Sequence, residues 1–136
     1  DLDLDGLLDL VVVNREAGVT LWRNAGDGTT DEVAAMGHWI AIALEQPPPN
    51  VDGIGAWVEV RTDAGVGERE ITVGGGHGGG KLGWIHTGLG DDTDAEVRVT
   101  WPDGEVGPWI SVDADQFVTI SRGNTVSVVA AVPRQP

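Results

Sequence analysis

The first nine residues carry four aspartates at spacings that suit a hard metal ion. The segment from Asp1 to Asp9 reads DLDLDGLLD, so three carboxylates alternate with leucines and a fourth follows a glycine. Calcium takes six to eight oxygen ligands in flexible geometry, and a glycine permits the turn that brings such ligands around one ion. Because four carboxylates in so short a segment repel one another, a bound cation is favoured over a solvated acidic turn.

The predicted Ca²⁺ ligands are four side chains and one backbone carbonyl. They are the carboxylates of Asp1, Asp3, Asp5 and Asp9 and the carbonyl of Leu7. An EF-hand would need a glutamate at the twelfth loop position and a helix after it. Here that position is Val12, and the β-branched run over 10–14 predicts a buried strand.

The composition excludes several classes of protein. With 22 acidic and 8 basic residues, the net charge of −14 is unsuited to nucleic acid or an anionic membrane and suits cations and basic partners. Cysteine is absent, which excludes disulfides and thiolate metal sites. No apolar run approaches the roughly 20 residues of a membrane span. We therefore expect neither a nucleic-acid partner nor a membrane-spanning segment.

The aspartate loop also predicts where the protein is located and that the chain is a fragment. Weak calcium sites fill only at the millimolar concentrations found outside the cytoplasm, so we expect a secreted or periplasmic protein. The chain begins at its first predicted ligand, Asp1, where an α-ammonium would stand beside the cation. We therefore expect a fragment of a longer protein whose N-terminal part is missing.

Short β-rich runs separated by glycine, of which there are 21, predict an all-β fold. The expected strands are 10–14, 20–24, 38–44, 56–62, 68–73, 85–88, 96–101, 117–121 and 125–132. Period-two alternation indicates an antiparallel β-sandwich or barrel-like domain. The weakly helical stretch 30–36 divides a first unit, residues 1–30, from a second, residues 37–132.

Other candidate sites are weaker than the aspartate loop. The glycine-rich segment 74–80 lacks the ending of a phosphate-binding loop and is interpreted as a surface loop. His38, His77 and His86 lie on separate segments without the spacing of metal ligands. The six tryptophans are expected mainly to pack in the core, and Trp57, which alternates onto the polar face of its strand, is the best candidate for an exposed platform for sugars. No nucleophile motif is present, so no catalytic residues are predicted.

Two known families resemble successive parts of the chain. Residues 1–24 resemble one FG-GAP (VCBS-type) repeat, the calcium-bearing blade unit of β-propellers such as those of integrin α chains, through the aspartate loop and the later LWRN motif. Residues from about 37 to 123 resemble an ASPIC/UnbV domain. The motifs that carry this second resemblance are GHWI, NVDGIGA, GGG, HTGLG and VTWPDG. The resemblance implies a partial propeller-type repeat, then an all-β domain of secreted or periplasmic proteins without established catalytic residues.

The sequence thus predicts a non-enzymatic, calcium-stabilised extracellular module for binding, adhesion or assembly, with a protein or carbohydrate partner. One alternative is a subunit of a homo-oligomer or filament that assembles by strand addition at the open edge of the first unit. Another is an accessory protein of a biosynthetic pathway, which the family association alone suggests.

Overall fold

The computed structural model describes residues 1–26, 37–75, 80 and 83–131, and this part of the chain contains strands but no helix. The strands are β1 (Leu10–Val12), β2 (Thr20–Trp22), β3 (His38–Glu45), β4 (Trp57–Thr62), β5 (Gly65–Glu70), β6 (Ile85–Gly90), β7 (Asp94–Thr100), β8 (Ile110–Asp113), β9 (Gln116–Ser121) and β10 (Thr125–Ala131). The predicted helical stretch 30–36 lies outside the described residues.

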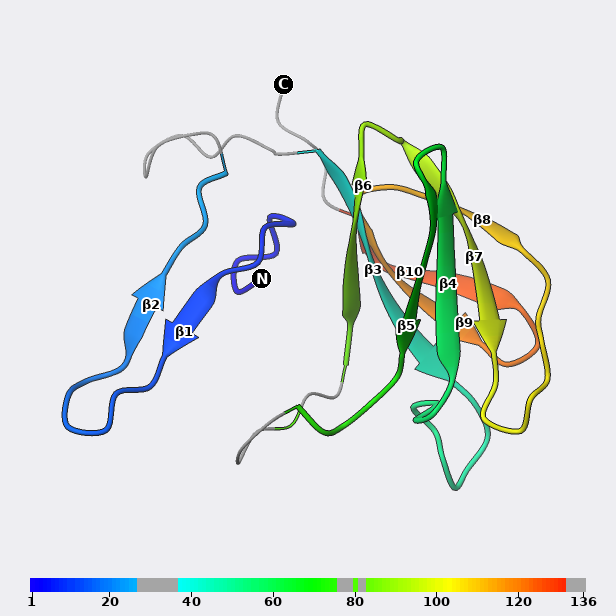
Figure 1. Cartoon of the computed structure of the whole chain (residues 1–136), viewed down its shortest axis with the longest axis horizontal. Helices are drawn as coiled ribbons and strands as arrows, with labels where there is room; N and C mark the ends of the chain where they lie inside the picture. Colours follow the sequence, from blue (N-terminus) through cyan, green and yellow to red (C-terminus); the bar gives the residue numbers. More distant parts are fainter. Residues whose placement is uncertain (27–36, 76–79, 81–82, 132–136) are drawn as a thin grey trace.

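Eight of these strands form two four-stranded sheets that pack face to face (Figure 1). The first sheet has the order β10-β9-β3-β6 and the second the order β5-β4-β7-β8. Neighbouring strands are antiparallel except β3 and β9, which run parallel in the middle of the first sheet. Strands β1 and β2 form a separate two-stranded antiparallel sheet that projects to one side in Figure 1.

The core lies between the two sheets, and strands such as β4 and β7 alternate buried apolar with outward polar side chains. Val58 and Val60 of β4 are 1% and 5% exposed and face the core, whereas Glu59 between them faces outward. The same alternation holds along β7, where Val97 and Val99 are buried. The largest fully buried side chains are those of Ile40, Ile42, Ile120, Val58, Val97 and Val118.

The first sheet also buries part of its outer face. Trp39, Ala41 and Phe117 point away from the main core and form a second small cluster, against which Trp84 and Ala130 pack. Trp39 and Phe117 meet edge to face with ring centroids 4.9 Å apart, an arrangement that the aromatic quadrupoles favour. Strand β3 is therefore buried on both faces, which matches its nearly continuous apolar sequence.

The all-β sandwich is confirmed, and neither sheet closes into a barrel. Three predictions about its strands were wrong. Strand β8 was missed, and β5 lies three residues earlier than expected, at Gly65–Glu70 instead of 68–73. Strand β1 forms but is not buried, because in the part of the chain that the structure describes it pairs with β2 alone. Val13, just beyond it, is 79% exposed.

Candidate metal centre

Local hydrogen bonds from aspartates to backbone amides fold the first nine residues into a tight loop. The Asp1 carboxylate accepts hydrogen bonds from the amides of Asp5 at 3.0 Å and Gly6 at 3.1 Å. Asp5 Oδ1 accepts another from the amide of Leu7 at 2.9 Å. Leu4 and Gly6 have positive φ values of 62° and 92°, a backbone conformation that is typical of tight turns. Short aspartate side chains that bond to nearby amides stabilise such turns.

Asp9 joins the two ends of the aspartate loop to the end of β2. Its carboxylate accepts hydrogen bonds from the amides of Leu2 at 2.8 Å and Asn24 at 2.9 Å. These backbone hydrogen bonds, the one from Leu2 first, lower the pKa of Asp9 below its ordinary value of 3.8. The carboxylate is therefore ionised over the whole neutral range, as a metal ligand must be.

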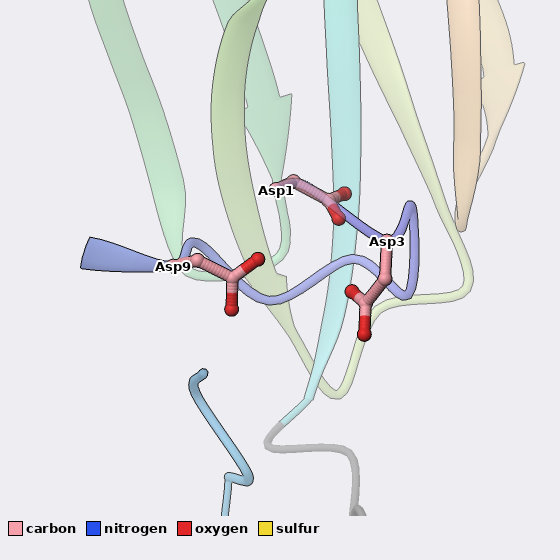
Figure 2. A group of neighbouring side chains, drawn as sticks. All are labelled: Asp1, Asp3 and Asp9. Carbon is pink, nitrogen blue, oxygen red and sulfur yellow. The ribbon is translucent and has the colours of Figure 1, made fainter. Parts of the chain in front are cut away.

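Three of the four predicted aspartates converge on one point. Asp1, Asp3 and Asp9 each offer a carboxylate oxygen, and these oxygens lie within 4.8 Å of one another. Figure 2 shows the three side chains, with those of Asp1 and Asp9 turned toward the space between them. In the described part of the chain this is the only group of three or more His, Asp or Glu side chains with such spacing.

Asp5 and Leu7, the other two predicted ligands, have contacts of their own. The Asp5 carboxylate is outside the trio and lies 3.4 Å from Nη2 of Arg23. Leu7 contributes its amide to Asp5, as described above. Arg23 also places Nε 2.8 Å from Oδ2 of Asp3. Arg23 was not among the predicted site residues, although it belongs to the LWRN motif of the FG-GAP resemblance.

The donor chemistry of the trio fits a hard divalent cation. Carboxylate oxygens are the preferred ligands of Ca²⁺, and three of them overcompensate its charge. Three side chains supply fewer than the six to eight ligands that Ca²⁺ takes, so the remaining ligands would be backbone oxygens and water. The Arg23 guanidinium would compete with a bound cation for Asp3, because it already forms an ion pair with that carboxylate.

The aspartate loop contacts the sandwich through Gly6. The Gly6 carbonyl oxygen lies 2.8 Å from Nε2 of His86 on β6, so this nitrogen must carry the hydrogen that it donates. The His86 ring in turn stacks on Trp39, with centroids 5.3 Å apart and planes within 10°. A Cβ on Gly6 would lie 1.9 Å from Nε1 of Trp39. The two predicted units are therefore in direct contact at this point.

The remaining sequence candidates are not brought together. Nδ1 of His38 lies 2.8 Å from Oδ2 of Asp115, an ordinary pairing at the start of β3. His86 belongs to the contact with Gly6, and His77 and most of the glycine-rich segment lie outside the described residues. Trp57 is 43% exposed on the outer face of β4, as predicted. The described residues include no helix that could cross a membrane.

Comparison with known families gives two matches along the chain. The model of the FG-GAP-like repeat matches residues 1–49, which contain the aspartate loop, β1, β2 and β3. The model of the ASPIC and UnbV family matches residues 46–127, from the end of β3 into β10. No curated protein and no solved structure matches the chain. Because the second match spans more than half of the sequence, the chain belongs to the ASPIC and UnbV family and carries an FG-GAP-like repeat before that domain.

Proposed function

We propose that this chain is a calcium-stabilised, non-catalytic module that serves binding or assembly outside the cytoplasm. The observation that carries the proposal is the convergence of the Asp1, Asp3 and Asp9 carboxylates in a loop that contacts the second unit. FG-GAP-like repeats often bind calcium and often take part in protein interactions. They commonly occur in extracellular or periplasmic proteins, where calcium is abundant.

The non-catalytic part of the proposal rests on chemistry as well as family. FG-GAP-like and ASPIC/UnbV domains are generally non-catalytic. The carboxylates of Asp1 and Asp9 already accept hydrogen bonds from backbone amides, so these two side chains hold the loop together. A bound cation would add to this organisation by removing the repulsion among Asp1, Asp3 and Asp9. In this proposal the cation fixes the aspartate loop against the sandwich, and the rest of the surface binds the partner.

Calorimetric titration of the full chain with Ca²⁺ tests the proposal, together with the variant Asp3→Asn. Asp3 is the most informative of the trio, because Asp1 and Asp9 also hold the loop together. We expect at least a tenfold weaker affinity in Asp3→Asn, since one of three charged ligands becomes neutral. Asp52→Asn, an exposed aspartate remote in sequence, is the matched control. Equal affinities in both variants, or no binding to the wild type at millimolar Ca²⁺, would contradict the proposal.

The β1–β2 sheet favours assembly as a second candidate function. It has only two strands, and nine large apolar side chains between residues 1 and 26 are more than 40% exposed. Isolated two-stranded sheets are marginally stable in water, and an unpaired strand edge recruits further strands. In this version copies of the chain associate through β1 or β2. Sedimentation with and without Ca²⁺ tests it, and a monomer at every concentration under both conditions would exclude it.

A further inference from the structure

A groove runs along the open side of the sandwich, between the edge strands β5 and β6. Its larger part has a volume of about 400 Å³ and is lined by Trp57, Arg69, Ile71, Gly83 and Ile85. An adjoining part of about 240 Å³ extends over Val58, Val60 and Gly67 and shares Arg69 and Ile85 with the first. Within the described residues each of the two strands pairs on one side only, β5 with β4 and β6 with β3.

The backbone of β5 offers free hydrogen-bonding groups toward this groove. Ile71 donates its amide hydrogen to the Ala56 carbonyl at 2.8 Å, and bonding toward β4 then falls on every second residue of β5. The amides and carbonyls of Val66, Glu68 and Glu70 therefore point away from β4, toward the open edge. All six residues of β5 are exposed. Such an edge is the element to which an extended peptide adds as a further strand.

The inner face of β5 leaves room for the side chains of an added strand. Residues that are directly opposite in a sheet point to the same face, and the buried Val58 and Val60 are opposite Arg69 and Gly67. Arg69 and Gly67 therefore face inward, where the other strands of this sheet carry apolar side chains. An added Cβ at Gly67 would meet nothing within 4 Å, so the space beside Gly67 is open to a ligand. The apolar residues at the base of this space, Val58, Val60 and Ile85, are 1%, 5% and 8% exposed.

The charged residues of β5 indicate which side chains an added strand would carry. On the outer face of β5, Glu68 is directly opposite Glu59, and Glu70 is opposite Trp57. The Glu59 carboxylate is neutralised by Arg98, but none of the ion pairs in the described residues includes Glu68, Glu70 or Arg69. Like charges opposite each other in a sheet are destabilising unless a counter-charge approaches. The outer face of β5 thus favours basic side chains, and Arg69 favours one inward carboxylate.

We propose that the groove between β5 and β6 binds an extended segment of a partner protein, which adds to β5 as a strand. Its outward side chains are basic and lie against Glu68 and Glu70. Its inward side chains are apolar, except for one acidic residue beside Arg69. The inference rests on the binding role proposed above because it names a partner for that role, but it requires no calcium at the aspartate loop. A net charge of −14 also draws basic segments toward the chain.

The test uses a labelled, end-blocked octapeptide of the sequence Lys-Val-Lys-Val-Lys-Glu-Lys-Val, whose binding to the full chain is followed by fluorescence anisotropy at low salt. A peptide of the same composition without alternation is the control ligand. The variant Glu68→Pro removes an edge amide that does not pair with β4, so the sandwich stays folded, which circular dichroism verifies. We expect it to weaken binding of the alternating peptide at least tenfold.

A charge variant provides a second, independent test of peptide binding. The double variant Glu68→Lys with Glu70→Lys reverses both outward charges of the groove, and we expect at least a tenfold loss of affinity. The control pair Glu16→Lys with Asp91→Lys changes the net charge equally at exposed sites elsewhere, and we expect less than a threefold loss. Equal losses in both pairs, or equal binding of the non-alternating peptide, would overturn the proposal, because both would indicate unspecific attraction.

Other occupants of the groove give distinct results. Binding of cellohexaose that Trp57→Ala removes, without any peptide binding, would overturn the proposal in favour of a sugar. Self-association that Glu68→Pro abolishes would overturn it in favour of a second copy of the chain. Peptide binding that persists when the calcium titration fails would leave the groove supported and contradict only the calcium proposal. Calcium binding without peptide binding would support the calcium proposal and overturn the proposal for the groove.

Discussion

Gly6 occupies a backbone position that other residue types cannot take without moving a neighbour. Its φ of 92° lies in the left-handed region that favours glycine, and an added Cβ would lie 1.9 Å from Nε1 of Trp39. The same residue provides the carbonyl that accepts the hydrogen bond from His86. One glycine therefore fixes both the turn of the aspartate loop and its contact with the sandwich.

We expect Gly6→Ala to detach the aspartate loop from the sheet, with a cost of about 1–3 kcal/mol for the strained backbone and the overlap with Trp39. Amide exchange of residues 1–9 should accelerate, and the indole N–H resonance of Trp39 should shift. The control is Gly18→Ala in the exposed turn between β1 and β2, where an added Cβ meets nothing within 4 Å. Identical exchange rates in the two variants would contradict this account.

At the residue scale, part of the candidate site was predictable. The alternating spacing of Asp1, Asp3 and Asp5 and the later Asp9 predicted one group of four carboxylates, and the structure brings three of them, Asp1, Asp3 and Asp9, close together. Spacing alone did not distinguish Asp5 from the other three aspartates. The Asp5 carboxylate contacts Arg23, which lies 18 residues further along the chain. The contact between Gly6 and His86 spans 80 residues, and no local pattern indicates which histidine lies there.

At the scale of elements, β4 and β7 are joined on their outer faces by a ladder of charges. Glu59 is opposite Arg98, and Arg61 is opposite Glu96. Arg98 binds the Glu59 carboxylate with both Nε, at 2.7 Å, and Nη2, at 2.6 Å. Both guanidinium groups lie over the ring of Trp109, 4.1 and 4.4 Å from its centroid. Trp109 thus covers the charges of the neighbouring strands, which explains why it is only half-buried.

Trp109→Ala should destabilise the sandwich through the loss of both stacked guanidinium groups. Each exposed cation–π contact contributes about 0.5–1 kcal/mol, so we expect a loss of about 1–3 kcal/mol with the apolar contacts included. Urea unfolding measures it. Trp22→Ala, at a tryptophan that is 61% exposed on β2, should change the free energy of unfolding much less. A similar effect in both variants would refute the role given to Trp109.

The ladder also predicts how stability depends on pH. The hydrogen bonds from Arg98 lower the pKa of Glu59 below its ordinary value of 4.5. Its contribution to stability is therefore fully present above pH 4.5 and is lost as the pH falls through the lower folded-state value. Glu59→Gln should destabilise the protein at pH 7, and the difference from wild type should shrink toward pH 3. Urea titrations at both values test this, with Glu16→Gln as the control. A constant difference would contradict the linkage.

The alternation of apolar and polar residues was sufficient to predict most of the strands. The strands that it did not predict have features that hide this alternation. Strand β5 has no buried residue, since it is an edge strand with glycine at inward positions, so no apolar pattern marks it. Strand β8 follows Pro108 and has only four residues, too few for a clear period. The parallel pairing of β3 with β9 depends on chain topology, which side-chain period does not encode.

At the scale of the whole molecule, all residues of the main core belong to the segment from β3 to β10 and its loops. We therefore expect residues 37–136 to fold without the first unit. The product should give a β-type circular dichroism spectrum and a cooperative thermal transition, at a lower midpoint because Trp39 loses its contact with Gly6. This experiment also tests the predicted division between residues 1–30 and 37–132. An unfolded product at 25 °C would contradict both.

The parallel pair at the centre of the first sheet has a consequence for biogenesis. Strand β3 is the first strand of the sandwich to leave the ribosome, yet its two neighbours are β6 and β9. One edge of β3 has no partner until β6 has been synthesised, and the other edge has none until β9 has been synthesised. Such high contact order slows folding and prolongs the exposure of an aggregation-prone segment. The nascent chain is therefore expected to depend on a holding chaperone until β9 has been synthesised.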